Sequence, residues 1–299
     1  MTAILQNKIK GEYILTVRRA DGSIKRELQF ENIITNNGLD LLMGGTTFNT
    51  YCSIGSGTST PTVSQTALDN RLASSSTQQT SSTTAQGSAP YYTTRSITYR
   101  FAAVPAGGYT VNEIGVGAGS TGTNLFSRAL ILDGSGNPIT LTLLESEILD
   151  ATYIVRNYPA LTGGDYTQSA VNISGTNYTF TWRALLVTNA SYWNLAPINS
   201  PNMFTYTGAL GTVTASAPGG TNLGSATGTL SAYVTGSYER QGNITFGLNA
   251  SNGTIASLYV TNSSGQAGPY AYQASLSPSL TKTSSQQLIL AYKISFARA

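Results

Sequence analysis

Histidine is absent from this 299-residue chain, and cysteine occurs once. Without histidine the chain cannot build a Ser-His-Asp or Cys-His catalytic arrangement, nor a metal site ligated by histidine. The single cysteine, Cys52, cannot form an intrachain disulfide, which fits folding in a reducing cytoplasm. Its place within a strand-like segment predicts a small core residue. Neither Gly-x-x-x-x-Gly-Lys nor Gly-x-Gly-x-x-Gly occurs in a strand-to-helix setting, so no phosphate-binding loop is predicted.

Charge is also scarce. Charged residues make up 10% of the chain, against about 25% in an ordinary soluble domain. A surface of this kind must be hydrated by hydroxyls and amides, or covered by neighbouring subunits. The net charge of +3 without a cluster of Lys and Arg argues against a nucleic-acid partner.

Long apolar runs are missing too. No run approaches membrane-spanning length, and residues 1–10 lack the apolar core of a signal peptide. We therefore expect no membrane insertion. The protein is expected to be made and kept in the cytosol, or to leave it by lysis.

What the chain does contain is typical of β-structure. Hydrophobic residues make up 40%, and the 18 tyrosines and many β-branched residues can bury enough area to order a Ser/Thr/Gly-rich chain. Residues 109–156 are predicted to form four strands separated by turns. In the last of these, Leu149, Ala151, Tyr153 and Val155 alternate with polar residues, as expected when one strand face lies on a core. A similar alternation returns at 288–296.

The first hundred residues contain further strand, turn and helix signals. Residues 12–30 form a predicted hairpin around Asp21-Gly22, and Leu39, Leu42 and Met43 share one face of a short helix predicted over 37–43. Strands are predicted over 50–55 and 91–101. Between them, the low-complexity polar segment 73–89 is interpreted as a flexible surface loop. The alternative is an arm that becomes ordered on a neighbouring subunit.

The chain is predicted to be all-β, with two β-sandwich or jelly-roll-like units and one short helix. The proposed boundaries are an N-terminal domain over 1–157, a linker over 158–170 and a C-terminal domain over 171–299. Segments starting at 243, 254 and 288 echo those starting at 96, 110 and 149 in the same order. This suggests an internal duplication, and the alternative is convergence of amphipathic strands.

Two sets of residues with side-chain oxygens are candidate chemical sites. Glu145 and Glu147, with Asp150 or Glu113, could supply a carboxylate pair for glycoside cleavage, but a solvated strand edge is favoured. The segment 133–137 offers oxygen ligands like a calcium loop, but a turn explains it and the acidic residue of an EF-hand is missing. We predict no catalytic residue, metal or cofactor, and no enzymatic activity.

Aromatic side chains are frequent in the second half of the chain. Exposed, they could stack on sugar rings or anchor a protein interface; buried, they would be ordinary core. Core or subunit interface is the favoured interpretation, with glycan contact as the alternative. The residues predicted as interface or glycan contacts are Tyr192, Trp193, Tyr206, Tyr238, Tyr270 and Tyr272.

Several short segments resemble proteins of tailed-bacteriophage particles. The first is the hairpin followed by Asn32-Ile-Ile-Thr-Asn-Asn-Gly-Leu39. The others are Ile54-Gly-Ser-Gly-Thr-Ser-Thr-Pro-Thr62 with Thr66-Ala-Leu-Asp-Asn-Arg-Leu72, and Thr110-Val-Asn-Glu-Ile-Gly-Val116 with Leu125-Phe-Ser-Arg-Ala-Leu130. Together with the strand 149–155, they are similar to modules of tail-fibre, collar and baseplate-associated proteins. The resemblance covers roughly residues 10–157 and carries no catalytic residues.

This resemblance implies a non-enzymatic structural component of the virion in the tail, neck (collar) or baseplate. It would assemble as a symmetric homo-oligomer and contact other virion proteins. The alternatives are a receptor-binding adhesin that contacts host surface glycan, and a capsid decoration or head-fibre protein. A polysaccharide depolymerase is the last alternative.

Overall fold

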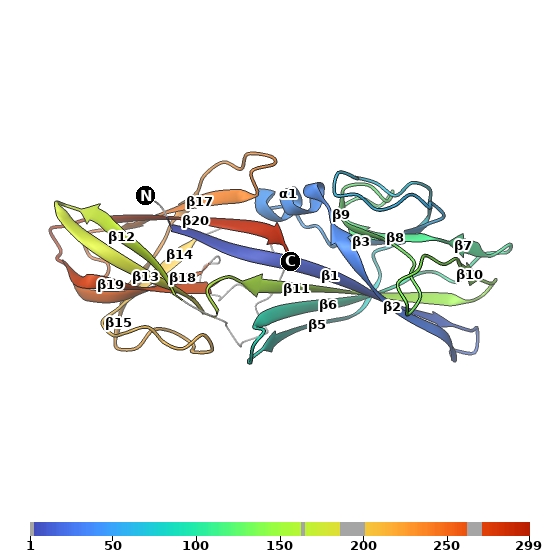
Figure 1. Cartoon of the computed structure of the whole chain (residues 1–299), viewed down its shortest axis with the longest axis horizontal. Helices are drawn as coiled ribbons and strands as arrows, with labels where there is room; N and C mark the ends of the chain where they lie inside the picture. Colours follow the sequence, from blue (N-terminus) through green and yellow to red (C-terminus); the bar gives the residue numbers. More distant parts are fainter. Residues whose placement is uncertain (1–2, 163–164, 186–200, 262–270) are drawn as a thin grey trace.

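The structure is a computed structural model that describes residues 3–162, 165–185, 201–261 and 271–299. Nearly all of its regular structure is β, in curled, mostly antiparallel sheets, with one helix among the described residues. The predicted all-β fold of β-sandwich type is thus confirmed. The molecule is elongated, with the C-terminal strands gathered at one end and residues 20–150 at the other (Figure 1).

The elements of the first half are β1 (Ala3–Arg18), β2 (Ile24–Ile34), α1 (Asn36–Gly44), β3 (Tyr51–Gly55), β4 (Arg71–Ser75), β5 (Gln78–Gln86), β6 (Tyr92–Arg100), β7 (Tyr109–Val111), β8 (Glu113–Gly117), β9 (Leu125–Leu130), β10 (Leu141–Leu143) and β11 (Ile148–Pro159). Those of the second half are β12 (Tyr166–Ile173), β13 (Thr176–Leu185), β14 (Asn202–Tyr206), β15 (Asn222–Thr227), β16 (Thr229–Leu230), β17 (Glu239–Phe246), β18 (Gly253–Thr261), β19 (Ala271–Lys282) and β20 (Leu288–Arg298).

Strand β1 connects the two ends of the molecule. It pairs with β11 over Asn7–Arg18, with β2 over Gly11–Arg18, and in parallel with β20 over Ala3–Ile9. The last strand of the chain therefore lies beside the first (Figure 1). This pairing crosses the predicted boundary between domains 1–157 and 171–299, and the two-domain division itself stays a prediction.

Local sequence explains the hairpin of β1 and β2. Gly22 has φ 84°, a conformation that favours glycine, and its N–H donates to the Arg19 carbonyl at 2.9 Å. The Asp21 carboxylate accepts from the Ser23 N–H at 2.9 Å. The predicted turn at Asp21-Gly22 is confirmed.

Helix α1 is capped at both ends. The Thr35 hydroxyl accepts from the Gly38 N–H at 2.8 Å, and Gly45 ends the helix in the left-handed conformation at φ 88°. Gly38 is required for close packing, because a Cβ there would lie 2.3 Å from the Phe126 carbonyl oxygen of β9. The predicted range 37–43 was short by one residue at each end.

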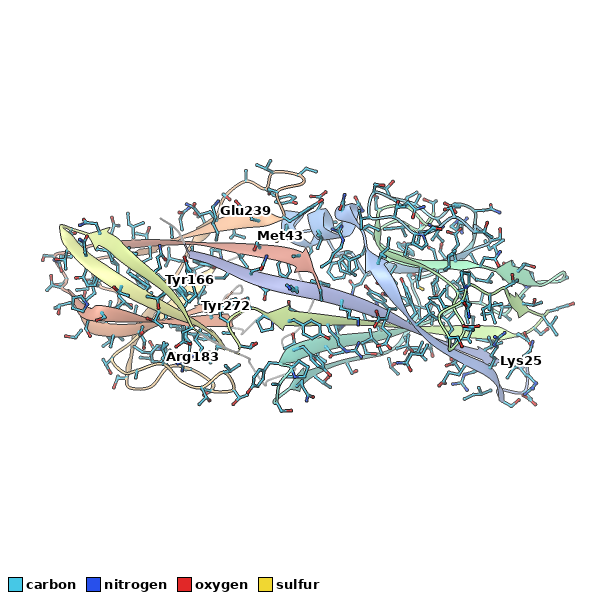
Figure 2. All side chains as sticks on the ribbon, in the orientation of Figure 1. Lys25, Met43, Tyr166, Arg183, Glu239 and Tyr272 are labelled. Carbon is cyan, nitrogen blue, oxygen red and sulfur yellow. The ribbon has the colours of Figure 1, made fainter. Side chains whose placement is uncertain are left out.

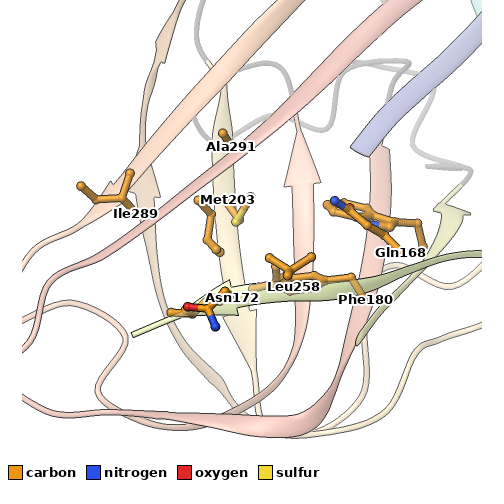
Figure 3. A pocket seen from close by; sticks show the side chains of 11 residues that line it. Gln168, Asn172, Phe180, Met203, Leu258, Ile289 and Ala291 are labelled. Atoms are coloured by element: carbon orange, nitrogen blue, oxygen red, sulfur yellow. The ribbon is translucent and has the colours of Figure 1, made fainter. Parts of the chain in front are cut away.

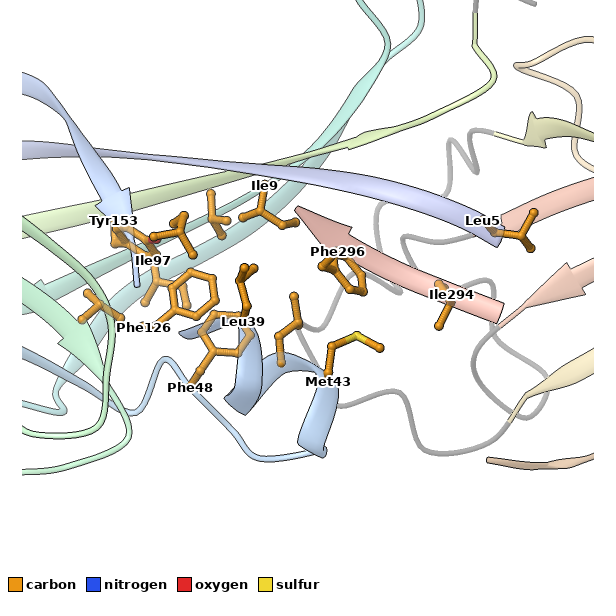
Figure 4. Packing of buried hydrophobic residues seen from close by; sticks show 14 of the residues in the cluster. Leu5, Ile9, Leu39, Met43, Phe48, Ile97, Phe126, Tyr153, Ile294 and Phe296 are labelled. Carbon is orange, nitrogen blue, oxygen red and sulfur yellow. The ribbon is translucent and has the colours of Figure 1, made fainter. Parts of the chain in front are cut away.

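The first sandwich forms between β5–β6–β11–β1–β2 and the strands β9–β8–β3–β4. Its sheets are joined across the core by a 2.8 Å hydrogen bond between Tyr13 Oη and Ser127 Oγ, and Phe48 stacks on Phe126 at 3.9 Å between ring centroids. From there buried side chains continue past Leu39, Met43 and Phe296 to Leu5 without a break (Figure 4). One core thus serves both halves.

The second half packs a six-stranded sheet, β12-β13-β19-β18-β14-β15, against β20 and β17. Contacts with the first half come from side chains as well as strand pairing. The Tyr233 hydroxyl hydrogen-bonds the Asp40 carboxylate of α1, which also accepts from the Gly236 N–H at 2.7 Å. Arg298 Nε donates to the Ile34 carbonyl at 2.6 Å. No helix in the described part is long and apolar enough to cross a membrane.

The segments compared in the duplication hypothesis lie in corresponding places. Strand β6 pairs antiparallel with β11, and β17 pairs antiparallel with β20. Strands β8 and β18 both belong to the sheets that face these pairs. Strand β11 pairs antiparallel with β1, however, and β20 pairs parallel with it, so the internal duplication stays a prediction.

Three predictions from sequence were wrong in detail. The segment 73–89, predicted as a loop, contains the end of β4 and all of β5, because pairing with β6 satisfies its backbone whatever its side chains. The first of the four strands predicted over 109–156 is divided at Asn112 into β7 and β8. The linker 158–170 is narrower than predicted, because β11 extends to Pro159 and β12 starts at Tyr166.

Candidate interaction site

Four segments that are distant in the sequence, 54–62, 66–72, 110–116 and 125–130, meet at a buried ion pair. Glu113 starts β8 and Arg128 lies on the adjacent β9, and neither side chain is exposed. Arg128 Nη2 lies 2.8 Å from Glu113 Oε2, and Arg128 Nε donates to the same oxygen at 3.0 Å. Burying a carboxylate and a guanidinium costs free energy, and the ion pair offsets this cost only when the remaining lone pairs and N–H groups are also hydrogen-bonded.

That capacity is satisfied by the segment between β3 and β4. Glu113 Oε1 accepts from the N–H groups of Gly57 at 3.0 Å and Asn70 at 2.9 Å, and Oε2 accepts from the Asp69 N–H at 3.1 Å. Arg128 Nη2 also donates to Asp69 Oδ2 at 2.8 Å. Gly57 is needed at this point, because a Cβ there would lie 2.4 Å from the Asp69 Cβ. The network therefore holds residues 56–70 against the sheet.

The same contacts lower the pKa of the Asp69 carboxyl. Partial burial tends to raise the pKa of this carboxyl, but hydrogen bonds from Ser59 and the nearby Arg128 guanidinium lower it below its usual value. Asp69 is thus ionised under neutral conditions and is the second carboxylate that pairs with Arg128. The arrangement holds backbone N–H groups of residues 57–70 in place through Glu113.

The acidic residues weighed for glycoside cleavage bind separate basic groups. Glu147 pairs with Lys25 at 2.7 Å, near the end of the β1–β2 hairpin where Figure 2 labels Lys25. Asp150 pairs with Arg100 at 2.7 Å and with Arg18 at 2.9 Å. Glu145 is exposed. Both paired carboxylates are buried, so the favoured interpretation as a solvated strand edge is wrong for Glu147 and Asp150. Their separate basic partners give the alternative of a catalytic carboxylate pair no support.

Cys52 and the segment 133–137, the other two candidates for chemistry, have structural roles. Cys52 is completely buried, and burial raises the pKa of its thiol. Asp133 Oδ1 accepts from the N–H groups of Ser135 at 2.8 Å and Asn137 at 2.9 Å, which confirms the turn. Over the described ranges, no group of three or more His, Cys, Asp or Glu side chains is placed to hold a metal ion.

The six predicted aromatic contacts do not form one surface. Tyr192, Trp193 and Tyr270 lie outside the described residues. Tyr272 is completely buried between the six-stranded sheet and β1, and its hydroxyl donates to the Gln6 carbonyl at 2.7 Å (Figure 2). As a surface contact Tyr272 was a wrong prediction, because alternation along β19 turns it toward the core. Tyr206 and Tyr238 are half-buried.

Tyr206 belongs to a small aromatic cluster that is separate from the main core. It lies on β14 with Phe204, whose ring stacks on Tyr259 of β18 at 5.5 Å. Burial raises the pKa of Tyr206. Tyr259 is 8% exposed, so Phe204 and Tyr206 are the rings that a ligand on this face of the sheet would touch.

A cavity of about 150 Å³ opens between β12 and β20 in the second half. Phe180, Met203 and Leu258 line it from the six-stranded sheet, and Ile289 and Ala291 from β20 (Figure 3). The Trp182 indole lines it too, but the atom Nε1 is buried without an acceptor. Gln168 and Asn172 of β12 also line the cavity, so its wall is mixed apolar and polar.

The exposed edge of β5 is the feature that sequence analysis missed. Gln78–Gln86 pairs with β6 on one side, and no other strand of the described chain pairs with its second side. The residues are exposed or half-buried, and none is charged. The signal available in the sequence was the run of β-branched threonines, which is compatible with a strand. The low-complexity, polar composition of 73–89 favoured a loop over a strand.

Comparison with known proteins finds no matching family model, no similar curated protein and no similar solved structure. The resemblance to phage virion proteins therefore stays a prediction based on the residues quoted for it.

Proposed function

We propose that the chain is a non-enzymatic structural subunit of a tailed-bacteriophage particle, located in the tail, neck or baseplate. The observation that carries this proposal is the network around Glu113 and Arg128. Segments quoted separately for their resemblance to virion proteins, at 54–62, 66–72, 110–116 and 125–130, provide the residues that meet there. They act as one structural unit.

The surface supports assembly with other protein chains. A chain with 10% charged residues presents few groups that resist close contact with a neighbour. The edge of β5 presents backbone donors and acceptors that another strand can pair with. Both features favour a symmetric homo-oligomer that also contacts other virion proteins.

Immunogold labelling of purified phage particles tests the location. An antibody raised against the chain is expected to label tails, necks or baseplates in negative-stain images, and antibody pre-absorbed with purified chain is the control. Label confined to soluble lysate would contradict the proposal. Label on the head surface would instead support the capsid decoration or head-fibre alternative.

The adhesin alternative is favoured by the cluster of Phe204 and Tyr206, because half-buried rings on a sheet face can stack on sugars. Its test is adsorption of the purified chain to host surface polysaccharide. Tyr206→Ala is expected to weaken adsorption under this alternative. Tyr166→Ala, at a 41% exposed tyrosine of β12, is the matched control.

A further inference from the structure

We infer that the cavity between β12 and β20 binds a small neutral molecule, which has an apolar body about the size of one ring and carries a hydrogen-bond acceptor. The acceptor takes the indole N–H of Trp182. The inference goes beyond the proposed structural role, because it assigns a ligand to the second half of the chain. It starts from an unsatisfied donor in the wall of the cavity.

Trp182 provides this donor. Its side chain belongs to β13, is 3% exposed and forms part of the cavity wall. No described residue accepts a hydrogen bond from the Nε1–H group. Folded proteins pair nearly all of their buried polar groups, because a buried donor without an acceptor raises the free energy of the folded state. A molecule that brings an acceptor into the cavity removes this cost.

The size and the apolar part of the wall define the body of the molecule. The cavity measures about 150 Å³, and an engineered apolar cavity of about this volume in another protein binds benzene. The rings of Phe180 and Trp182 are nearly parallel, at 17° with 6.2 Å between centroids. Met203 and Leu258 continue the wall on the same sheet (Figure 3). Aromatic, thioether and aliphatic groups in one wall favour a flat apolar ring.

The polar part of the wall excludes a charged molecule. Gln168 and Asn172 present carboxamides, and no described residue that lines the cavity is charged. The Asn172 carboxamide is also engaged in the turn after β12, where its Nδ2 donates to Asn177 Oδ1 at 2.9 Å and its Oδ1 accepts from the Gly175 N–H at 3.1 Å. An ion in this cavity would lose its hydration without gaining a counter-ion.

The cavity can be reached from the surface. Ile289 of β20 lines it and is 62% exposed, so part of the wall lies at the outside of the molecule. Water that enters is poorly held, because a buried water needs about three hydrogen bonds and most of the lining side chains are apolar. A molecule with an apolar body contacts the same side chains favourably and needs one hydrogen bond.

Three neutral or charged probes of similar size test the inference on the full chain. Acetophenone has a carbonyl acceptor on an aromatic ring, α-methylstyrene has a methylene group in place of the oxygen, and benzoate has a negative charge. Ligand-observed NMR is expected to give acetophenone a Kd of about 1 mM or lower, which is within reach of a molecule of this size. Benzoate is expected to bind at least about tenfold more weakly.

Trp182→Phe isolates the hydrogen bond, because it keeps a ring and removes the donor. The affinity ratio of acetophenone to α-methylstyrene is expected to fall at least about tenfold in this variant. Comparing ratios cancels the different hydrophobicity of the two probes and the change in ring size. Tyr166→Phe is the matched control, because Tyr166 pairs with Trp182 across β12 and β13 but does not line the cavity. Its ratio should equal that of the wild type.

A spectrum of the wild-type chain gives a measurement that does not depend on the fold of a variant. With ¹⁵N-labelled tryptophan, the chain has two indole N–H signals, from Trp182 and Trp193. Acetophenone is expected to move one of them downfield, as a new hydrogen bond does, and α-methylstyrene is not. The signal that moves should be the one missing from the Trp182→Phe spectrum.

Failure of acetophenone to bind at about 10 mM would overturn the inference. Benzoate binding as tightly as acetophenone would do the same for the neutral class of ligand. So would an affinity ratio that is unchanged in folded Trp182→Phe, because the indole N–H would then make no contact with the acceptor.

Discussion

Arg128 and Glu113 lie 2.8 Å apart on adjacent strands, and neither side chain is exposed to solvent. Removing one member leaves the other as a buried charge without its counter-ion. Arg128→Met is therefore expected to lower the free energy of unfolding by about 3–5 kcal/mol. Chemical denaturation measures the loss.

The control for this prediction is the exposed pair of Lys10 and Glu31, whose side chains are 36% and 67% accessible. Lys10→Ala is expected to change stability by no more than about 1 kcal/mol. Equal effects of Arg128→Met and Lys10→Ala would show that the buried network does not hold residues 56–70.

Acid is expected to destabilise the protein partly through Asp150. Burial tends to raise the pKa of this carboxyl, but hydrogen bonds from Arg100 and Arg18 outweigh burial and lower it. A carboxyl with a depressed pKa in the folded state contributes stability above its unfolded pKa, about 3.9. That contribution is lost as pH falls through the folded pKa. Asp150→Asn is therefore expected to flatten the dependence of stability on pH below about pH 5.

Denaturation curves between pH 2 and 7 measure this dependence. Glu27→Gln, on the exposed face of β2, is the control and should follow the wild-type curve. If the free energy of unfolding of Asp150→Asn falls with pH as steeply as that of the wild type, Asp150 does not contribute to the acid sensitivity.

The two halves are expected to unfold together. Strand β1 pairs with β11 and β20, and one core extends from Phe126 to Leu5. Separating the halves would expose the edge of Ala3–Ile9 and the apolar side chains beneath it. Calorimetry is expected to show one transition with equal calorimetric and van't Hoff enthalpies. Two resolved transitions would favour independent domains at 1–157 and 171–299.

Tyr272 and Tyr206 are expected to respond differently to loss of the hydroxyl. Tyr272→Phe removes the 2.7 Å hydrogen bond to the Gln6 carbonyl, at an expected cost of about 1 kcal/mol. Tyr206→Phe removes a hydroxyl from a half-buried ring and should change stability by less than about 0.5 kcal/mol. Thermal unfolding of the two variants tests the contrast, and a larger effect at Tyr206 would contradict the assignment of Tyr272 to the core.

The thiol of Cys52 should be inert in the folded protein. Complete burial keeps reagents away from the thiol and raises its pKa, so little reactive thiolate forms. A thiol reagent such as dithionitrobenzoate is expected to react with about one thiol per chain in guanidinium chloride and with none in buffer at pH 8. Rapid reaction of the native protein would show that the strand β3 opens.

Sequence by itself determined the features that depend on neighbouring residues. Asp21-Gly22 specified a turn because glycine adopts positive φ, and Leu39, Leu42 and Met43 specified one face of a helix that ends at Gly45. Alternation along β11 and β20 identified strands and their inward faces. In the helix and the strands, the apolar residues recur with the period of the backbone, so sequence alone identifies the buried face.

Tertiary structure decided the features that join distant residues. The parallel pairing of Ala3–Ile9 with Tyr292–Arg298, and the meeting of Gly57, Asp69, Glu113 and Arg128, depend on which strands become neighbours. Strand β5 exists because β6 offers an edge to its polar residues, and Tyr272 is buried because β19 faces β1. Strand order and register follow from packing the whole core, and a local period carries no information about them.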